Sequence, residues 1–217
     1  MGFVVAIDGP AASGKGTIAA RLGLALGLPV LDTGLLYRAV GVMVLRAHGD
    51  LDDEAAAAEA ARAIDVETLG APALRGGDAA EAASRIAVHP AVRQALLDFQ
   101  RAFAMRAEGA ILDGRDIGTV VTPDAPAKLY VTASLEARAR RRWNELASED
   151  CGPTFDEILA DIERRDERDS DRANAPLRPA PDAVLLDTTD LSIDRAFDAA
   201  RRIVEAARAR WERSRRA

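Results

Sequence analysis

A glycine-rich stretch near the start of the sequence has residue types and spacing suited to binding the phosphates of a nucleotide. It reads GPAASGKGT over residues 9–17, between a short apolar run and a segment with helical spacing. Gly9 and Gly14 permit the tight backbone path in which successive amides point at phosphate oxygens, and Lys15 can reach the outer phosphates. We therefore predict that this stretch is a phosphate-binding loop.

Gly16 departs from the general form of this motif, which has Ser or Thr directly after the lysine. That hydroxyl holds magnesium in other phosphate-binding loops, and here only Thr17, one place later, offers one. The sequence therefore predicts no direct protein ligand for magnesium at this position.

Two charged clusters follow short apolar runs elsewhere in the chain. In LDTGLLYR, the pair Tyr37 and Arg38 could stack on or hold a second nucleotide, or could be a core tyrosine and a surface charge. In LDGRDIGTVV, two carboxylates and Arg115 flank Gly114, which is a costly arrangement unless they meet charged ligands or polar base edges. A structural turn, or a hydrolase with Asp113 and Asp116 as its acid–base pair, is the alternative.

A third cluster is rich in arginine and lies on two expected helices. The first helix carries Arg138, Arg141 and Arg142, and the second carries Arg165, Arg168, Asp169 and Arg172 on one face. A solvated helix crossed by ion pairs between successive turns explains the second set equally well.

The composition excludes several kinds of site and partner. The net charge of −6 disfavours a general nucleic-acid surface, although Lys15 and Lys128 are the only lysines among 29 basic residues. One cysteine, Cys151, which we expect in a loop, excludes an internal disulfide, and two histidines disfavour a histidine-rich metal site. No apolar run approaches the roughly 20 residues that span a bilayer. We expect a cytoplasmic protein that binds neither membrane nor nucleic acid.

Five short apolar runs alternate with helical patterns and predict an α/β fold. We expect parallel strands at 3–8, 29–32, 109–113, 127–133 and 183–188, and helices at 15–26, 33–49, 52–64, 89–106, 135–147, 155–172 and 192–214. Thr33 is the expected cap of its helix, and residues 65–80 are expected to form a small hairpin or loop. Such a sheet is covered on both faces, and its ligands bind beyond the carboxyl ends of the strands, where Asp8, Asp32, Asp113 and Asp187 fall.

The sequence closely resembles the bacterial cytidylate kinases. The segments IDGPAASGKGT, LDTGLLYRAVG, LDGRDIGTVV and RDERDSDRANAPL carry the resemblance, which runs from the first strand to the last helix. It implies transfer of the terminal phosphoryl group of ATP to CMP or dCMP, with Mg²⁺, by a P-loop kinase similar in fold to adenylate kinase. It also implies a single domain over 1–217, with a core at about 1–34, 84–134 and 180–217, a monophosphate-binding region at about 35–83 and a lid at about 135–175. Region 65–83 is shorter and richer in Ala and Gly than the sheet-forming insertion typical of that family.

The resemblance also assigns residues to the two substrates. It implies that ATP meets Gly9, Pro10, Ala11, Ala12, Ser13, Gly14, Lys15, Gly16, Thr17, Arg138, Arg141 and Arg142. It implies that CMP meets Thr33, Tyr37, Arg38, Ser84, Arg93, Arg115, Asp116, Arg165, Asp169 and Arg172. Lys15, Arg115, Arg172 and Asp113 are the implied catalytic residues, with Thr17 or Asp113 contacting magnesium only through water.

Two other functions are compatible with a phosphate-binding loop. The first is a kinase that phosphorylates another small monophosphate, and the second is a P-loop switch or ATPase that binds a partner protein. The second set of arginines would have no purpose in a switch. No heptad pattern demands a partner subunit, so we expect a monomer.

Overall fold

A computed structural model describes residues 2–65, 69–74, 76–146 and 152–216. It contains a five-stranded, all-parallel sheet in the order β2-β3-β1-β4-β5. The strands are β1 (Val4–Asp8), β2 (Val30–Asp32), β3 (Ala110–Gly114), β4 (Ala127–Thr132) and β5 (Val184–Asp187). All five predicted strands are confirmed, whereas Cys151 lies outside the described residues.

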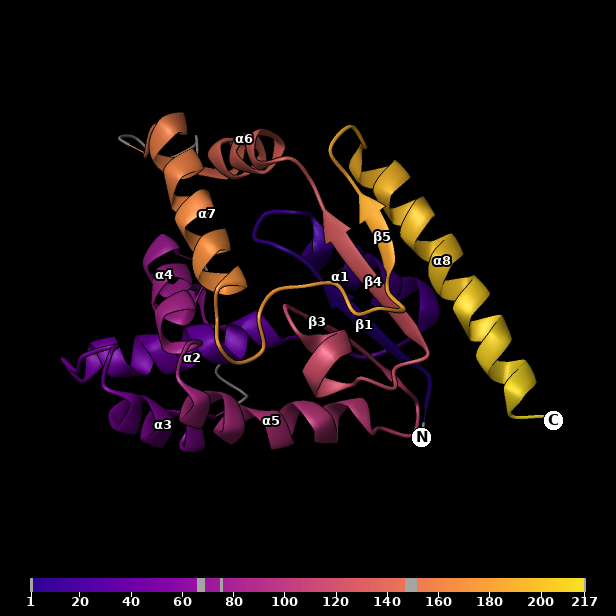
Figure 1. The fold of residues 1–217 in the computed structure, drawn as a ribbon, viewed down its shortest axis with the longest axis horizontal. Helices are drawn as coiled ribbons and strands as arrows, with labels where there is room; N and C mark the ends of the chain where they lie inside the picture. Colours follow the sequence, from indigo (N-terminus) through magenta and orange to yellow (C-terminus); the bar gives the residue numbers. More distant parts are fainter. Residues whose placement is uncertain (1, 66–68, 75, 147–151, 217) are drawn as a thin grey trace.

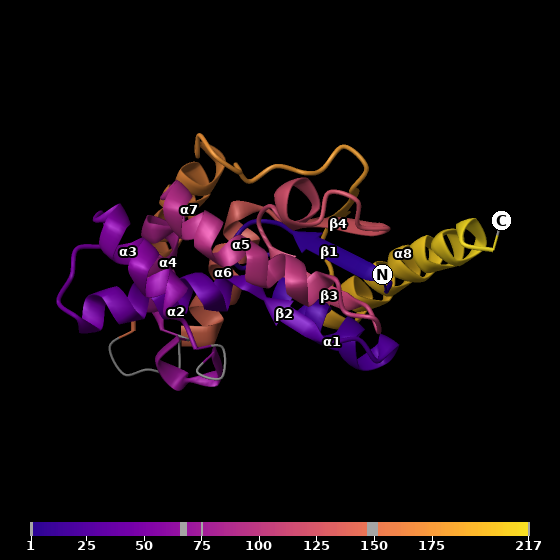
Figure 2. The ribbon, with the colours of Figure 1, turned by 90° about the horizontal axis from the view of Figure 1, so that it is seen from below.

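Each face of the sheet is covered by helices, as the apolar runs predict. Val4 and Ala6 of β1 pack into the core that contains α2 (Thr33–Arg46), α3 (Glu54–Arg62), α4 (Gly77–Ile86) and α5 (Pro90–Ala104). Val5 and Ile7 pack on the opposite face against α1 (Lys15–Leu26) and α8 (Ile193–Ser214). The central strand is therefore apolar on both faces, as expected of a buried parallel strand. Figure 2 shows α2, α3 and α4 gathered at one end of the molecule and α8 at the other.

Two further helices, α6 (Leu135–Leu146) and α7 (Phe155–Ser170), lie beyond the carboxyl ends of β4 and β5 (Figure 1). They enclose a small apolar cluster of their own, formed by Ala139, Ile158 and Ile162. A capping box at Thr154 and Glu157 begins α7. None of the helices in the described part of the chain is long and apolar enough to cross a membrane.

Several predicted element boundaries are wrong. Thr33 does not cap α2, because Asp32 is the N-cap and accepts a hydrogen bond from the Gly34 amide at 2.9 Å. The helix also ends at Arg46, before the predicted Gly49. Asp32 is the better cap because its carboxylate also complements the positive end of the helix.

The expected hairpin or loop at 65–80 is also wrong over its last residues. A 3₁₀ turn, η2 (Pro72–Leu74), precedes α4, and the described residues of this region contain no strand. The helix packs so closely on α2 that a Cβ added to Gly41 would lie 2.7 Å from the Cβ of Ala82. The small residues Gly41 and Ala82 therefore allow the two helices to pack closely.

Candidate functional site

The predicted phosphate-binding loop joins the end of β1 to the start of α1. Gly9 has φ +152°, and a Cβ there would lie 1.9 Å from the Val131 carbonyl oxygen, so only glycine fits. Gly14 is left-handed, with φ +89°, and leads directly into the helix. The Lys15 side chain is buried and its Nζ donates to the Pro10 carbonyl at 3.2 Å. The backbone curls around the lysine in the manner that the glycine spacing predicts.

Arginines of α6 brace this loop from outside. Arg138 is buried and donates from Nε to the Ala133 carbonyl at 3.0 Å and from Nη1 to the Ala11 carbonyl at 3.3 Å. Its Nη2 pairs with Asp166 of α7 at 2.6 Å. The three guanidinium nitrogens of Arg138 are therefore all engaged with protein, whereas Arg142 lines the open cavity in front of the loop. The role predicted for Arg138 in ATP binding remains a prediction.

Arg141 makes a similar contact one turn further along α6. Its Nη1 lies 3.4 Å from the Ser13 carbonyl and 3.0 Å from the Thr188 hydroxyl oxygen. The Thr188 hydroxyl itself donates either to the Ser13 carbonyl, at 2.9 Å, or to the Thr132 carbonyl, at 3.0 Å. The segment after β5 and the Arg-rich helix thus hold the same turn of the phosphate loop.

Two cavities meet beyond the carboxyl ends of the strands. The first, of about 320 Å³, is bounded by the phosphate loop, α6 and α7. The second, of about 50 Å³, is lined by every residue predicted to bind CMP except Arg38: Thr33, Tyr37, Ser84, Arg93, Arg115, Asp116, Arg165, Asp169 and Arg172. Arg38 lines the first cavity and donates to the Leu74 carbonyl at 2.8 Å. Arg115 and Arg165 line both cavities and therefore lie where they meet.

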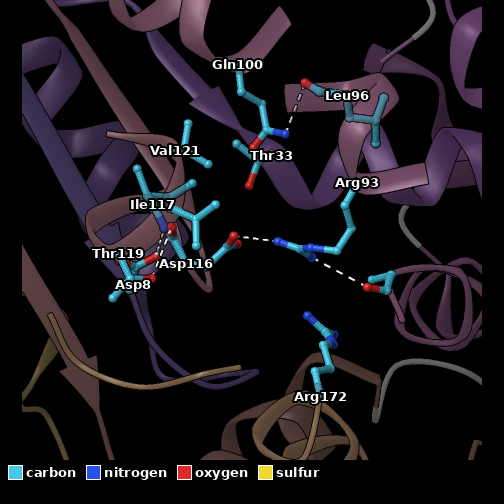
Figure 3. Close-up of polar contacts among 12 residues, drawn as sticks. Asp8, Thr33, Arg93, Leu96, Gln100, Asp116, Ile117, Thr119, Val121 and Arg172 are labelled. Atoms are coloured by element: carbon cyan, nitrogen blue, oxygen red, sulfur yellow. Dashed lines mark hydrogen bonds and ion pairs between the residues drawn. The ribbon is translucent and has the colours of Figure 1, made fainter. Parts of the chain in front are cut away.

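An ion pair between Arg93 and Asp116 lies at one end of the second cavity (Figure 3). Asp116 comes from the loop after β3 and is buried, and Arg93 comes from α5. The Arg93 guanidinium also lies 5.7 Å from the centre of the Tyr37 ring. Three segments distant in the sequence thus meet here and present a carboxylate and a guanidinium to the cavity.

Asp169 is the centre of the other charged group. It is only 1% exposed, and its carboxylate accepts from Arg115 Nε at 3.0 Å, from Arg172, and from the Ser84 hydroxyl at 3.3 Å. Burial acts to raise the pKa of Asp169, but Arg115 and Arg172 outweigh it and hold that pKa below its usual value. The Nε atoms of Arg165 and Arg172 have no hydrogen-bond partner in the described part of the chain. This arrangement holds several cations around one anion.

Asp113 lies beneath the phosphate loop. Its Oδ2 would be 3.3 Å from a Cβ added to Gly16, and its buried Oδ1 has no hydrogen-bond partner among the described residues. Burial raises the pKa of Asp113 to about 7, although Lys15 opposes the shift. Gly16 thus leaves room for this carboxylate where the general motif has a hydroxyl.

A family model described as cytidylate kinase matches residues 5–206. The chain belongs to the cytidylate kinase family. Among its relatives, a cytidylate kinase of Caulobacter sp. (strain K31) is 62% identical over 97% of this chain and 98% of its own. Another, from Azorhizobium caulinodans, is 61% identical over 95% of this chain and 100% of its own. The solved structure of an uncharacterized protein from Eubacterium ventriosum ATCC 27560 is 13% identical, with a TM-score of 0.52 over 94% of this chain and 98% of that one, and supports the fold alone.

This member of the cytidylate kinase family has contacts at the site that sequence reasoning missed. The Gln100 side chain is buried, and its Nε2 donates to the Leu96 carbonyl at 3.1 Å. Thr188 and the bracing role of Arg138 were also missed. No local pattern marks such residues, because their partners lie far away in the sequence. Asp8, at the end of β1, is different: it is part of the motif IDGPAASGKGT, but the sequence alone gave it no specific role.

Proposed function

We propose that the two cavities hold the two substrates of a phosphotransferase. The chain transfers the terminal phosphoryl group of ATP to CMP or dCMP, giving ADP and CDP or dCDP, in pyrimidine nucleotide metabolism. The observation that carries the assignment of the cavities is their shared boundary at Arg115 and Arg165. A phosphoryl group must pass directly from donor to acceptor, so the two sites have to meet at positive charge.

In this proposal the donor occupies the first cavity. The amides of residues 9–17 hold the ATP phosphates, Lys15 meets the outer ones, and Arg142 closes over them from α6. Arg138 and Arg141 act mainly by holding the Ala11 and Ser13 carbonyls in place. We propose one domain over 1–217, in which residues 135–175 form a lid and 35–83 the acceptor-binding region.

The acceptor occupies the second cavity, which has to widen from about 50 Å³ to admit a whole nucleotide. Asp116 accepts a hydrogen bond from the cytosine amino group, which uracil replaces by an acceptor, and Arg93 and Ser84 face the base beside it. Arg38, Arg115 and Arg172 meet the phosphate, and Tyr37, Arg165 and Asp169 surround the ribose and phosphate, with Thr33 at the cavity wall. Arg38 would have to leave the Leu74 carbonyl and reach across the shared boundary of the cavities.

The chemistry needs no general base. The second pKa of a phosphate monoester is about 6, so CMP is already a nucleophile at neutral pH. Catalysis then rests on alignment and on positive charge at the transferring group, which Lys15, Arg115 and Arg172 supply. Closure of α6 and α7 excludes water, which otherwise would hydrolyse ATP.

The residues present fit a magnesium ion held through water. The unpaired Oδ1 of buried Asp113 lies at the phosphate loop, whereas the described residues contain no cluster of three or more His, Cys, Asp or Glu that could cage a metal. When bound with ATP, magnesium would neutralise charge on the phosphates. Asp113, or Thr17 at the exposed start of α1, would orient water bound to it. We further propose that the enzyme works as a monomer in the cytoplasm, on nucleotides and not on nucleic acid.

An acceptor screen tests this function. ADP release from ATP and magnesium would be compared with CMP, dCMP, UMP, AMP, GMP and no acceptor. We expect a strong response to CMP and dCMP, a weak one to UMP and none to the purine nucleotides. A preference for another monophosphate would overturn the acceptor assignment, and ADP release that ignores the acceptor would indicate an ATPase.

A further inference from the structure

Asp8 is a buried acid directly before the phosphate loop that the proposed mechanism does not use. It is the last residue of β1 and directly precedes Gly9 of the phosphate loop. Its side chain is 3% exposed, and burial raises its pKa to about 6, against the hydrogen bonds from Gly118 and Ile117 that lower it. Burying an ionisable acid costs free energy, so a buried acid at this position is expected to serve a purpose.

The backbone of Asp8 is fixed on both sides. In the central strand it pairs with Gly114 of β3 and with Tyr130 of β4. Its carboxylate therefore projects from one of the most constrained points of the sheet, at the carboxyl ends of the strands. Any group that this carboxylate holds is placed relative to the phosphate loop.

The carboxylate holds the loop that follows β3. Oδ1 accepts from the Ile117 amide at 2.7 Å, and Oδ2 accepts from the Gly118 amide at 2.8 Å (Figure 3 shows Asp8 beside Ile117). These amides begin a short π-helix, η3 (Ile117–Val121). The same loop is attached at its other end by the pairing of Gly114 with Asp8. Arg115 and Asp116 are thus the only two residues between the two attachments.

The glycine at position 118 makes room for the contact between the Asp8 carboxylate and the loop after β3. A Cβ at position 118 would lie 3.3 Å from Asp8 Oδ2 and 3.2 Å from the Lys128 Cδ, so the absence of a side chain lets the carboxylate approach. A carboxylate is also the group that suits two amides, because both of its oxygens accept. Asparagine at position 8 would present one oxygen and one donor, and the donor would face an N–H group.

We propose that Asp8 is a positioning residue that fixes Arg115 and Asp116 relative to the phosphate loop, and thereby aligns the acceptor with the donor. This inference rests on the proposed function, because it assigns CMP to the cavity that Asp116 lines. It differs from a purely structural role, since the effect of losing Asp8 falls on the acceptor and not on ATP. A uniform loss of folded enzyme would instead lower kcat and leave both KM values unchanged.

The test compares Asp8→Asn with wild-type enzyme in steady-state assays and in calorimetric titrations with CMP alone. Hydrogen bonds to charged groups support an expected rise of about 10- to 100-fold in the KM and Kd for CMP. The ratio of kcat/KM for CMP over UMP should fall about 10-fold, as expected from a displaced base contact. The KM for ATP should stay within about threefold, because the phosphate loop keeps its own contacts.

Asp53→Asn is a matched control. Asp53 also accepts from two backbone amides, those of Ala55 and Ala56 at 3.0 and 3.1 Å, but it lies at the exposed start of α3 and lines neither of the two cavities. We expect its kinetic constants and CMP affinity to equal those of the wild type. Gly118→Ala perturbs the same contact by adding a methyl group next to Asp8 Oδ2, while the carboxylate itself is unchanged. Like Asp8→Asn, this variant should raise the KM for CMP. It keeps the inference testable if Asp8→Asn does not fold.

The outcomes separate the two proposals. A wild-type enzyme that does not respond to CMP overturns the proposed function. If the wild type prefers CMP, but Asp8→Asn binds CMP with unchanged Kd and keeps the CMP over UMP ratio, only the role of Asp8 is overturned. Equal losses for ATP and CMP would also overturn it.

Discussion

Replacing Asp116 by asparagine should weaken the preference for CMP over UMP. Asp116 is 5% exposed, and its Oδ2 pairs with Arg93, which in the proposed complex would leave the other oxygen for the base. In the variant the single amide oxygen should keep the contact with Arg93, because a guanidinium only donates. The amide nitrogen then faces the base and offers a donor, which suits the carbonyl oxygen of uracil rather than the amino group of cytosine.

The expected size of the effect follows from the free energy by which one polar contact to a base edge discriminates between bases. A good polar contact to a base edge discriminates by about 1–3 kcal/mol, which corresponds to about 5- to 150-fold. We therefore expect the ratio of kcat/KM for CMP over UMP to fall by about 10- to 100-fold. ADP release at saturating ATP, with each acceptor varied, measures the ratio directly.

Two controls make the result interpretable. The variant leaves Arg93 without its charge partner, so its melting temperature must be shown to lie well above the assay temperature. Asp98→Asn changes the same residue type at an exposed position of α5 and should leave the ratio unchanged. A ratio in Asp116→Asn equal to that of the wild type would refute the proposed cytosine contact.

Three further predictions concern Lys15 and Asp169. Lys15→Met should reduce phosphoryl transfer by at least about 100-fold while the circular dichroism spectrum stays unchanged, and retained activity would contradict the role of the loop. Burial and the neighbouring Arg115 lower the pKa of Lys15 to about 8, so kcat/KM for ATP should fall above that pH as the free enzyme loses this proton. Bound phosphates favour the protonated lysine, so kcat should not show the same fall; a flat profile of kcat/KM up to about pH 9.5 would exclude this titration. Asp169→Asn should lower the free energy of unfolding at pH 7 by about 3–5 kcal/mol, because it leaves the partly buried Arg115 and Arg172 without their anion. Since the pKa of Asp169 is lowered on folding, its contribution is present above about pH 4 and is lost as the pH falls through the folded value. Urea unfolding at pH 7 and in acid should therefore show a smaller acid-induced loss in this variant than in Asp171→Asn, an exposed control beyond the end of the same helix.

The sheet was predictable because its strands are short apolar runs that each end at a polar residue. The helix α4 was not, because Gly70, Gly76 and Gly77 lie before it or at its first residue and are typical of turns, and its alanines give a weak pattern. What decides its structure is the close contact of Ala82 with Gly41 of α2, which is a property of the assembled core. Local preference is a weak guide wherever tertiary packing chooses between alternatives.

The candidate site was predictable to a similar degree. Motif residues such as Lys15 and Asp116 were placed by the resemblance, and most of them line the same two cavities. Thr188, which holds the phosphate loop in place, carries no such mark, and the resemblance assigned Arg138 to ATP binding without indicating its contact with that loop. Their hydrogen bonds go to backbone carbonyls of the phosphate loop, and a backbone partner leaves no trace in the sequence.

The contrast between the charge of the whole chain and that of the site explains how an acidic protein can hold two anions. The net charge is −6, yet Arg115, Arg165 and Arg172 converge on the single buried carboxylate of Asp169. Burial and Arg115 lower the pKa of Arg165 to about 10, which means that the fold holds this cation at a cost. Phosphates bound between the arginines would offset that cost, so substrates should stabilise the folded enzyme as well as react in it. In the proposed mechanism the same fixed cations would meet the charge that develops during transfer without having to move, and this preorganisation is what a reaction without a general base requires.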